Sequence, residues 1–206
     1  MADYKKADYW QSLARKEGYP ARSVYKLKEM DEKFGLLKGA GRAGFRILDV
    51  GAAPGSWSLY ILRKLAGKGF LAAVDLSPLS REFDKGLFDG GNFFFVQGDF
   101  TQAAALEAVA CRGPYSLILS DAAPSTTGNG AVDAARSFDL AQAVTDCAEK
   151  NLAPGGSLLI KVFQSADSAD LLKRFKGLFG TAKTFKPKAC RSESFEVYFI
   201  GTGKKG

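Results

Sequence analysis

The feature that most constrains the fold of this chain is the stretch from Ile47 to Trp57, which reads Ile-Leu-Asp-Val-Gly-Ala-Ala-Pro-Gly-Ser-Trp. An apolar run with an acid near its end is followed by a glycine-rich turn, and from Trp57 the apolar residues recur at helical spacing. Glycines let the main chain take positive φ and pass close to a bound molecule, and the start of a helix offers unpaired N–H groups. The stretch therefore predicts a strand, a tight turn and a helix, with the turn as the floor of a ligand site.

The composition of this turn indicates which ligand it holds. A dinucleotide fingerprint needs glycine at its first, third and sixth positions, and Gly51, Ala53 and Ser56 satisfy only the first of these. The turn also lacks the Lys-Ser/Thr pair of a phosphate-binding loop. A nucleoside ligand without phosphates is therefore favoured, and S-adenosylmethionine is the common ligand of that kind.

Two further acids follow the next two apolar runs. Asp75 closes Phe70-Leu-Ala-Ala-Val-Asp at 24 residues after Gly51, close to the roughly 20-residue interval at which an acid meets ribose hydroxyls in such folds. Asp99 follows a third run and is predicted to accept from an adenine amino group. Acids are common in turns, so the prediction rests on their repetition after successive strands.

The order of the elements predicts an α/β fold. Apolar runs alternate with helical patterns, which indicates a parallel sheet covered on both faces, and the last two runs lack a helix between them and should pair as an antiparallel hairpin. We therefore expect a Rossmann-like, mostly parallel seven-stranded sheet with an antiparallel last strand. The predicted strands span residues 47–50, 70–74, 93–97, 115–119, 157–163, 182–185 and 196–202, and helices are predicted at 21–34, 103–110, 132–151 and 171–179.

The length of 206 residues fits one well-filled domain. We divide it into an N-terminal arm, residues 1–20, and a single domain, residues 21–206. In the arm, basic residues that can bind phosphates alternate with aromatic residues that can stack on bases, although such an arm can equally pack on the domain. The residues concerned are Tyr4, Lys5, Lys6, Tyr9, Trp10, Arg15, Lys16 and Tyr19.

The net charge of +7 is unevenly distributed along the chain. Residues 1–46 carry eleven Lys/Arg against six Asp/Glu and residues 173–206 carry nine against two, whereas the middle is acidic. Two basic segments brought together by folding would form the footprint expected for a phosphate backbone, although scattered charge also serves solubility. RNA is therefore a candidate partner.

Other counts narrow the chemistry and the location. No apolar run approaches the roughly 20 residues of a membrane span and no secretory signal is apparent, so we expect no membrane association and a cytoplasmic protein. The three cysteines are far apart and predict neither disulfides nor a zinc site. Because the chain has no histidine, acid–base chemistry falls to Lys, Asp, Glu or Tyr, and no metal site is expected.

A lysine interrupts one predicted buried strand. Lys161 lies within Leu158-Leu-Ile-Lys-Val-Phe163, where a charge is costly unless it has partners or a task. In an open α/β sheet the ligand crevice lies at the carboxyl ends of the parallel strands. Asp121 ends the fourth strand and Glu196 opens the antiparallel last strand at the same edge. These three groups should converge, although a lysine paired with a single acid would also satisfy the pattern.

Several segments together resemble the FtsJ/RrmJ family of ribosomal RNA 2′-O-ribose methyltransferases, the RlmE type. The resemblance runs from Tyr9 to Lys205 and is carried by Ala-Arg-Ser-Val-Tyr-Lys-Leu, Asp-Val-Gly-Ala-Ala-Pro-Gly-Ser-Trp, Ser-Asp-Ala-Ala-Pro, Leu-Ala-Pro-Gly-Gly-Ser, Lys-Val-Phe-Gln and Ser-Phe-Glu-Val-Tyr. It implies a catalytic tetrad of Lys26, Asp121, Lys161 and Glu196, and a cofactor site of Gly55, Trp57, Asp75, Asp99 and Asp121. One departure is Ser56, where the family usually has a second glycine.

The resemblance implies methyl transfer from S-adenosylmethionine to a ribose 2′-hydroxyl, at a uridine of large-subunit ribosomal RNA, with S-adenosylhomocysteine as product. Lys161 would be the base, Lys26 and Glu196 would orient the sugar, and Asp121 would stabilise the lysines. A monomer acting on ribosomal RNA within the large subunit is expected. Transfer RNA or cap RNA as substrate stays open, as does a non-catalytic RNA-binding factor for ribosome assembly. Base methylation is disfavoured, because no aromatic follows Asp121-Ala-Ala-Pro and no Pro-Cys occurs.

Overall fold

The computed structural model describes residues 2–124, 128, 130–164, 168–191 and 194–206, with side chains described from residue 9 onward except at 130 and 131. The helices are α1 (Ala2–Lys16), α2 (Val24–Phe34), α3 (Ser56–Leu65), α4 (Ala103–Ala110), α5 (Gly130–Asn151) and α6 (Ser168–Leu178), with a 3-10 turn at Leu87–Asp89. The strands are β1 (Arg46–Val50), β2 (Phe70–Asp75), β3 (Phe93–Gln97), β4 (Tyr115–Ser120), β5 (Leu152–Phe163), β6 (Phe179–Phe185) and β7 (Glu196–Lys204).

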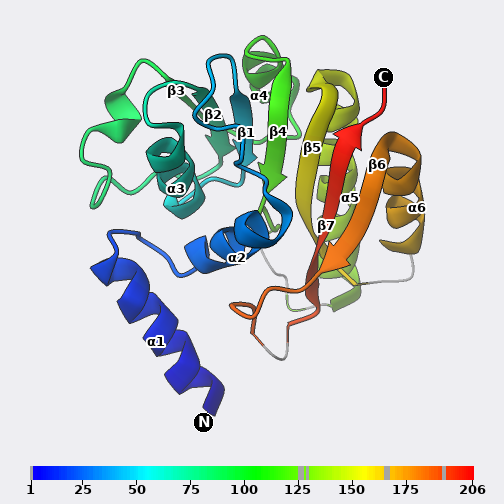
Figure 1. The fold of residues 1–206 in the computed structure, drawn as a ribbon. Coiled ribbons are helices and arrows are strands. Elements are labelled where there is room, and N and C mark those ends of the chain that lie inside the picture. Colours follow the sequence, from blue (N-terminus) through cyan, green and yellow to red (C-terminus); the bar gives the residue numbers. More distant parts are fainter. Residues whose placement is uncertain (1, 125–127, 129, 165–167, 192–193) are drawn as a thin grey trace.

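The strands form one seven-stranded sheet in the order β3-β2-β1-β4-β5-β7-β6 (Figure 1). β1 to β5 pair in parallel, whereas β7 runs antiparallel to both β5 and β6. The predicted α/β fold, with its antiparallel last strand and terminal hairpin, is confirmed. This order places the end of β4 beside the end of β5 and the start of β7, which is the arrangement that the proposed site requires.

Helices cover both faces of the sheet and make two apolar cores. One core joins α2 and α3 with the last turn of α1, and the other joins α4, α5 and α6. Alternate strand residues point to opposite faces, so Ile47 enters the first core and Leu48 the second. No helix in the described part of the chain has the length and hydropathy needed to cross a membrane.

Two strands begin earlier than predicted. β5 starts at Leu152 and not at residue 157, because Leu152 pairs with Tyr115 before a register shift between Tyr115 and Leu117. Phe179, predicted on a helix face, is the first residue of β6. Its ring packs so closely on Gly201 of β7 that a Cβ there would lie 2.3 Å from it. Tertiary pairing thus overrode the local pattern in both places.

The predicted N-terminal arm contains helix α1, which the sequence did not indicate. Ala14 and Tyr19 are buried in the same core as α2, and the Arg63 guanidinium donates hydrogen bonds to the carbonyls of Glu17 and Gly18. The ring of Tyr19 is therefore not available for base stacking. The side chains at positions 4, 5 and 6 lie outside the described residues, and the division at residue 20 stays a prediction.

Candidate active site

The turn after β1 is built on two glycines in the left-handed region. Gly51 has φ 79° and Gly55 has φ 106°. A Cβ on Gly51 would lie 2.5 Å from the Cα of Ala122, and one on Gly55 would lie 2.9 Å from the ring of Phe88. Glycine is therefore required at both positions by conformation and by space. The predicted strand, turn and helix are confirmed.

A cavity of about 530 Å³ opens at the carboxyl ends of β1, β2 and β4, within the usual size range of small-molecule sites. Its floor includes Gly51 and Ala53 of the turn, and three of the predicted cofactor residues, Asp75, Asp99 and Asp121, line it. The lining also holds Arg136 and Asp139. Four carboxylates face one guanidinium, so the cavity has a negative character that suits a cationic ligand.

Main-chain donors hold two of these carboxylates in place. Asp75 accepts from the amide N–H groups of Ala53, at 2.9 Å, and Ser77, at 2.8 Å. Asp99 accepts from the amide and the hydroxyl of Thr101, at 2.9 and 2.8 Å. These hydrogen bonds, the backbone one foremost, lower the pKa of Asp99. Both acids are thus oriented by hydrogen bonds and pair with no cation among the described residues, which leaves their charge available to a ligand.

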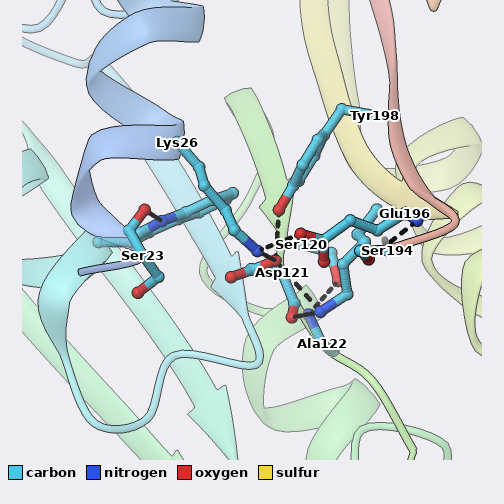
Figure 2. A network of polar contacts seen from close by, with 10 residues as sticks. Ser23, Lys26, Ser120, Asp121, Ala122, Ser194, Glu196 and Tyr198 are labelled. Carbon is cyan, nitrogen blue, oxygen red and sulfur yellow. Dashed lines mark hydrogen bonds and ion pairs between the residues drawn. The ribbon is translucent and has the colours of Figure 1, made fainter. Parts of the chain in front are cut away.

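A cluster of ionisable side chains adjoins the cavity. Lys161 Nζ lies 3.2 Å from Asp121 Oδ1 and donates to the Asp121 carbonyl at 2.5 Å. Lys26 Nζ, from α2, lies 3.0 Å from Glu196 Oε1 and 3.8 Å from Asp121 Oδ1 (Figure 2). The four side chains are only 8–16% exposed. The predicted convergence of Asp121, Lys161 and Glu196 is confirmed, whereas their catalytic roles stay predictions.

Burial and charge oppose each other in this cluster. Burial would raise the pKa of Asp121, but the ammonium groups of Lys161 and Lys26 outweigh it and the pKa is lowered. Burial would likewise lower the pKa of Lys26, but Asp121 and Glu196 outweigh it and the pKa is raised. Asp121 and Lys26 are therefore charged at neutral pH, and the ion pairs offset the cost of removing them from water.

Comparison with known proteins identifies the family. The model of the FtsJ-like methyltransferases matches residues 19–204. The chain belongs to this family. It is 46% identical to ribosomal RNA large subunit methyltransferase E of Treponema denticola, over 98% of both chains. It is 42% identical to the protein of the same name from Oleidesulfovibrio alaskensis, over 98% of this chain and 94% of that protein.

Solved structures support the fold of the methyltransferase. A ribosomal RNA methyltransferase, putative, from Plasmodium falciparum superposes with a TM-score of 0.73 at 26% identity, over 91% of this chain and all of that one. A human methyltransferase-like protein 13 bound to S-adenosylhomocysteine shares the fold at a TM-score of 0.54 and 14% identity, over 81% of this chain and 73% of that chain. The Rossmann-like methyltransferase fold is thereby established.

The sequence analysis assigned no role to Tyr198, although this residue contacts the cluster of Lys26, Asp121, Lys161 and Glu196. Its hydroxyl donates to Asp121 Oδ1 at 2.6 Å (Figure 2). Burial, together with Asp121 and Glu196, raises its pKa well above the ordinary value, so it remains a donor. The signal was present in Glu-Val-Tyr, because alternate residues of a strand share a face. Tyr198 and Glu196 therefore reach the same site.

Gly55 and Trp57, both predicted to bind the cofactor, lie outside the cavity lining. Trp57 is buried, and its Nε1 donates at 2.8 Å to the carbonyl of Ser23, the residue before α2. Its ring centroid is 6.2 Å from that of Tyr198. Trp57 thus braces the helix that carries Lys26, and cofactor contact by Gly55 or Trp57 stays a prediction.

Ser56, the departure from the family pattern, is also buried. Its Oγ accepts from the amide of Ala21 at 2.8 Å, which ties the start of α3 to the segment before α2. A glycine there would leave that amide without this acceptor. The serine therefore helps to fix the segment before α2, the helix that carries Lys26.

Asp49 is the fully buried acid of the first strand. Ser58 Oγ donates to Asp49 Oδ2 at 2.7 Å, and Oδ1 has no hydrogen-bond partner among the described residues. Burial raises the pKa of Asp49 to about 7, the Ser58 hydrogen bond opposes the shift, and Asp121 and Asp75 add to it. Three acids thus lie close together under the turn. Within the described residues no group of His, Cys, Asp and Glu is arranged to hold a metal ion.

Proposed function

We propose that this methyltransferase transfers a methyl group from S-adenosylmethionine to a ribose 2′-hydroxyl of large-subunit ribosomal RNA, at a uridine. The observation that carries the proposal is the largely buried cluster of Lys26, Asp121, Lys161 and Glu196 beside an acidic cavity, with Asp121 shared by both. The names of its relatives, ribosomal RNA large subunit methyltransferase E at 41–46% identity, support the substrate.

The cavity fits S-adenosylmethionine in size and in charge. Asp75 would accept from the ribose hydroxyls and Asp99 from the adenine amino group, since both carboxylates are already oriented by main-chain donors. The bound cofactor would supply an electrophilic methyl group on a sulfonium. The acidic lining favours that positive charge without any metal.

In the proposed reaction the cluster positions and deprotonates the substrate hydroxyl. Lys161, as the neutral amine, would accept the 2′-hydroxyl proton, because no histidine is available for the task. Lys26 and Glu196 would hold the sugar, and Asp121 would keep Lys161 aimed at the cavity edge. Alignment of this kind contributes up to roughly 7–11 kcal/mol in favourable cases.

The test is methyl transfer with several RNAs offered side by side. The protein and labelled S-adenosylmethionine are incubated with each of four substrates: large ribosomal subunits from cells lacking the enzyme, naked ribosomal RNA, transfer RNA and capped RNA. The modified nucleotides are then mapped by mass spectrometry. We expect one ribose methylation in the large subunit. Methylation confined to transfer RNA or capped RNA would move the protein to another substrate, and tight RNA binding without transfer would make it a non-catalytic assembly factor.

Binding to RNA should depend on salt. Because the segments 1–46 and 173–206 are basic, each phosphate contact should add roughly 0.7–0.9 to the slope of log K against log salt. Equilibrium binding at several salt concentrations measures this slope, and a flat dependence would contradict the basic footprint. Sedimentation of the protein alone would test whether it acts as a monomer.

A further inference from the structure

We infer that Phe195 is a stacking platform for an RNA base next to the methylated ribose, an inference that rests on the proposed function. Phe195 is 74% exposed. It stands immediately before Glu196, whose carboxylate pairs with Lys26 at 3.0 Å. Phe195 thus places an exposed aromatic ring one residue along the chain from the proposed site.

The main chain that carries this ring is fixed on both sides. The amide of Gln164, which follows β5, donates to the Phe195 carbonyl at 3.1 Å. Lys186 Nζ donates to the Ser194 carbonyl at 2.7 Å, and the amide of Glu196 donates to Ser194 Oγ at 3.2 Å. The exposed ring is therefore carried by main chain that is hydrogen-bonded at residues 194–196. These hydrogen bonds reduce the main-chain freedom that would be lost when a flat ligand stacks on the ring.

Two exposed apolar side chains lie at this edge of the sheet. Single exposed apolar residues are normal on protein surfaces. Among the described residues, however, the two most exposed large ones are Phe195 and Leu76. Leu76 follows Asp75 and lines the cavity. Leu76 follows β2 and Phe195 precedes β7, and these strands lie on opposite sides of β4, the strand that leads to Asp121.

The surroundings of Phe195 suit a nucleic acid. In the connection between β6 and β7, Pro187, Ala189 and Cys190 are buried, whereas the basic side chains beside them are exposed. These are Lys186, Lys188 and Arg191. The connection is also tied to α2, because the Lys188 amide donates to Glu29 Oε2 at 2.8 Å.

Exposed cations beside an exposed aromatic ring have the chemistry that recognises single-stranded nucleic acid. Cations contact the phosphates, and the ring accepts the face of any base. Sequence-specific contacts to RNA fall on unpaired nucleotides whose bases can be turned outward. The ligand is therefore an unpaired nucleotide at or beside the target ribose, held with its sugar toward the cluster.

The inference is tested with Phe195→Ala, Phe195→Leu and Phe195→Trp in the full chain, using steady-state methyl transfer to large ribosomal subunits. Loss of stacking should raise the KM for RNA, or lower kcat/KM, by roughly 5- to 150-fold in the alanine variant. Trp should restore the parent value, because it keeps the π-face. Leu, which is apolar but not aromatic, should behave like Ala.

S-adenosylmethionine affinity should be unchanged in all three variants, which controls for folding of the site. Parent-like kinetics in Phe195→Ala, or full rescue by Phe195→Leu, would overturn the inference. Equilibrium binding of the same variants to ribosomal RNA, with S-adenosylhomocysteine present, separates this inference from the proposed function. If the parent binds RNA but transfers no methyl group, the proposed function fails, while the comparison of Ala, Leu and Trp still decides the role of the ring.

Discussion

The charged groups on the two sides of Asp121 are held in different ways. On the cavity side, Asp75 and Asp99 are held by amide and hydroxyl donors and form no ion pair with another described residue. On the other side, Asp121 and Glu196 are paired with Lys161 and Lys26. The acidic lining of the cavity therefore suits a cationic ligand, whereas the two acids and the two lysines of the cluster form ion pairs with one another.

This difference suggests that the cavity side serves cofactor binding and that the cluster side serves methyl transfer. Carboxylates held by the main chain give a fixed field, which favours a ligand of opposite charge without needing to move. A paired lysine can instead exchange its proton while its neighbours hold it in position. Changes on the cavity side should therefore affect cofactor affinity, and changes on the cluster side should affect the rate of transfer.

The largest expected effect is on the cluster side. Lys161→Ala should reduce the rate of methyl transfer by roughly 10²- to 10⁴-fold, the usual contribution of a general base. Lys161→Arg should be as inactive, because an arginine stays charged and accepts no proton. Single-turnover transfer measures the rate, and calorimetric titration should show nearly unchanged cofactor affinity. Near-parent turnover in Lys161→Arg would mean that the side chain acts only as a fixed positive charge.

The next effect lies on the cavity side. Asp75→Ala should weaken S-adenosylmethionine binding by about 10- to 150-fold, because hydrogen bonds to a charged group are worth about 1.5–3 kcal/mol. Transfer at saturating cofactor should stay close to that of the parent. Asp75→Asn, which keeps one acceptor oxygen for the turn, is the matched control for folding. If cofactor affinity is unchanged in Asp75→Ala, the ribose assignment is wrong.

A third prediction concerns the buried acid below both regions. The pKa of Asp49 is raised from 3.8 to about 7 by burial, so the folded state binds this proton more tightly than the unfolded state. Its contribution to the free energy of unfolding should be complete below about pH 4 and should be lost as the pH rises through about 7, by up to roughly 4 kcal/mol.

Asp49→Asn, which stays neutral, should lose this pH dependence. Urea unfolding of both proteins at pH 5 and pH 8 measures it, with Glu107→Gln, an exposed carboxyl on α4, as the control that keeps the parent slope. Equal slopes for the parent and Asp49→Asn would show that Asp49 does not retain its proton in the folded state.

The smallest expected effect is at Ser56. Ser56→Ala removes the acceptor of the Ala21 amide and should lower the free energy of unfolding by about 1 kcal/mol, measured by urea unfolding. Cofactor affinity should change little, because Ser56 does not line the cavity. A loss of cofactor affinity as large as that of Asp75→Ala would show that the start of α3 contributes to the cofactor site.

Local pattern was enough to find the sheet and the acids at its edge. The glycine turn, the alternation of elements and the positions of Asp75, Asp99 and Asp121 follow from residue spacing, because a strand that ends in an acid must present it at the carboxyl edge of a parallel sheet. Lys161 was found because a charge within an apolar run needs a partner. Helix α1 and the first residues of β5 and β6 were missed, because their formation depends on packing against distant residues.

Sequence by itself determined the fold class, the carboxyl edge as the site, and the convergence of an aspartate, a lysine and a glutamate there. Only the tertiary structure decided which contacts surround these groups. Tyr198 donates to Asp121, and Phe195 remains exposed. Trp57 and Ser56 hydrogen-bond the segment before α2 and do not line the cavity. Spacing along a strand fixes the face and the edge that a side chain occupies. Its partners are set by which elements pack across that edge, and this is a property of the folded chain.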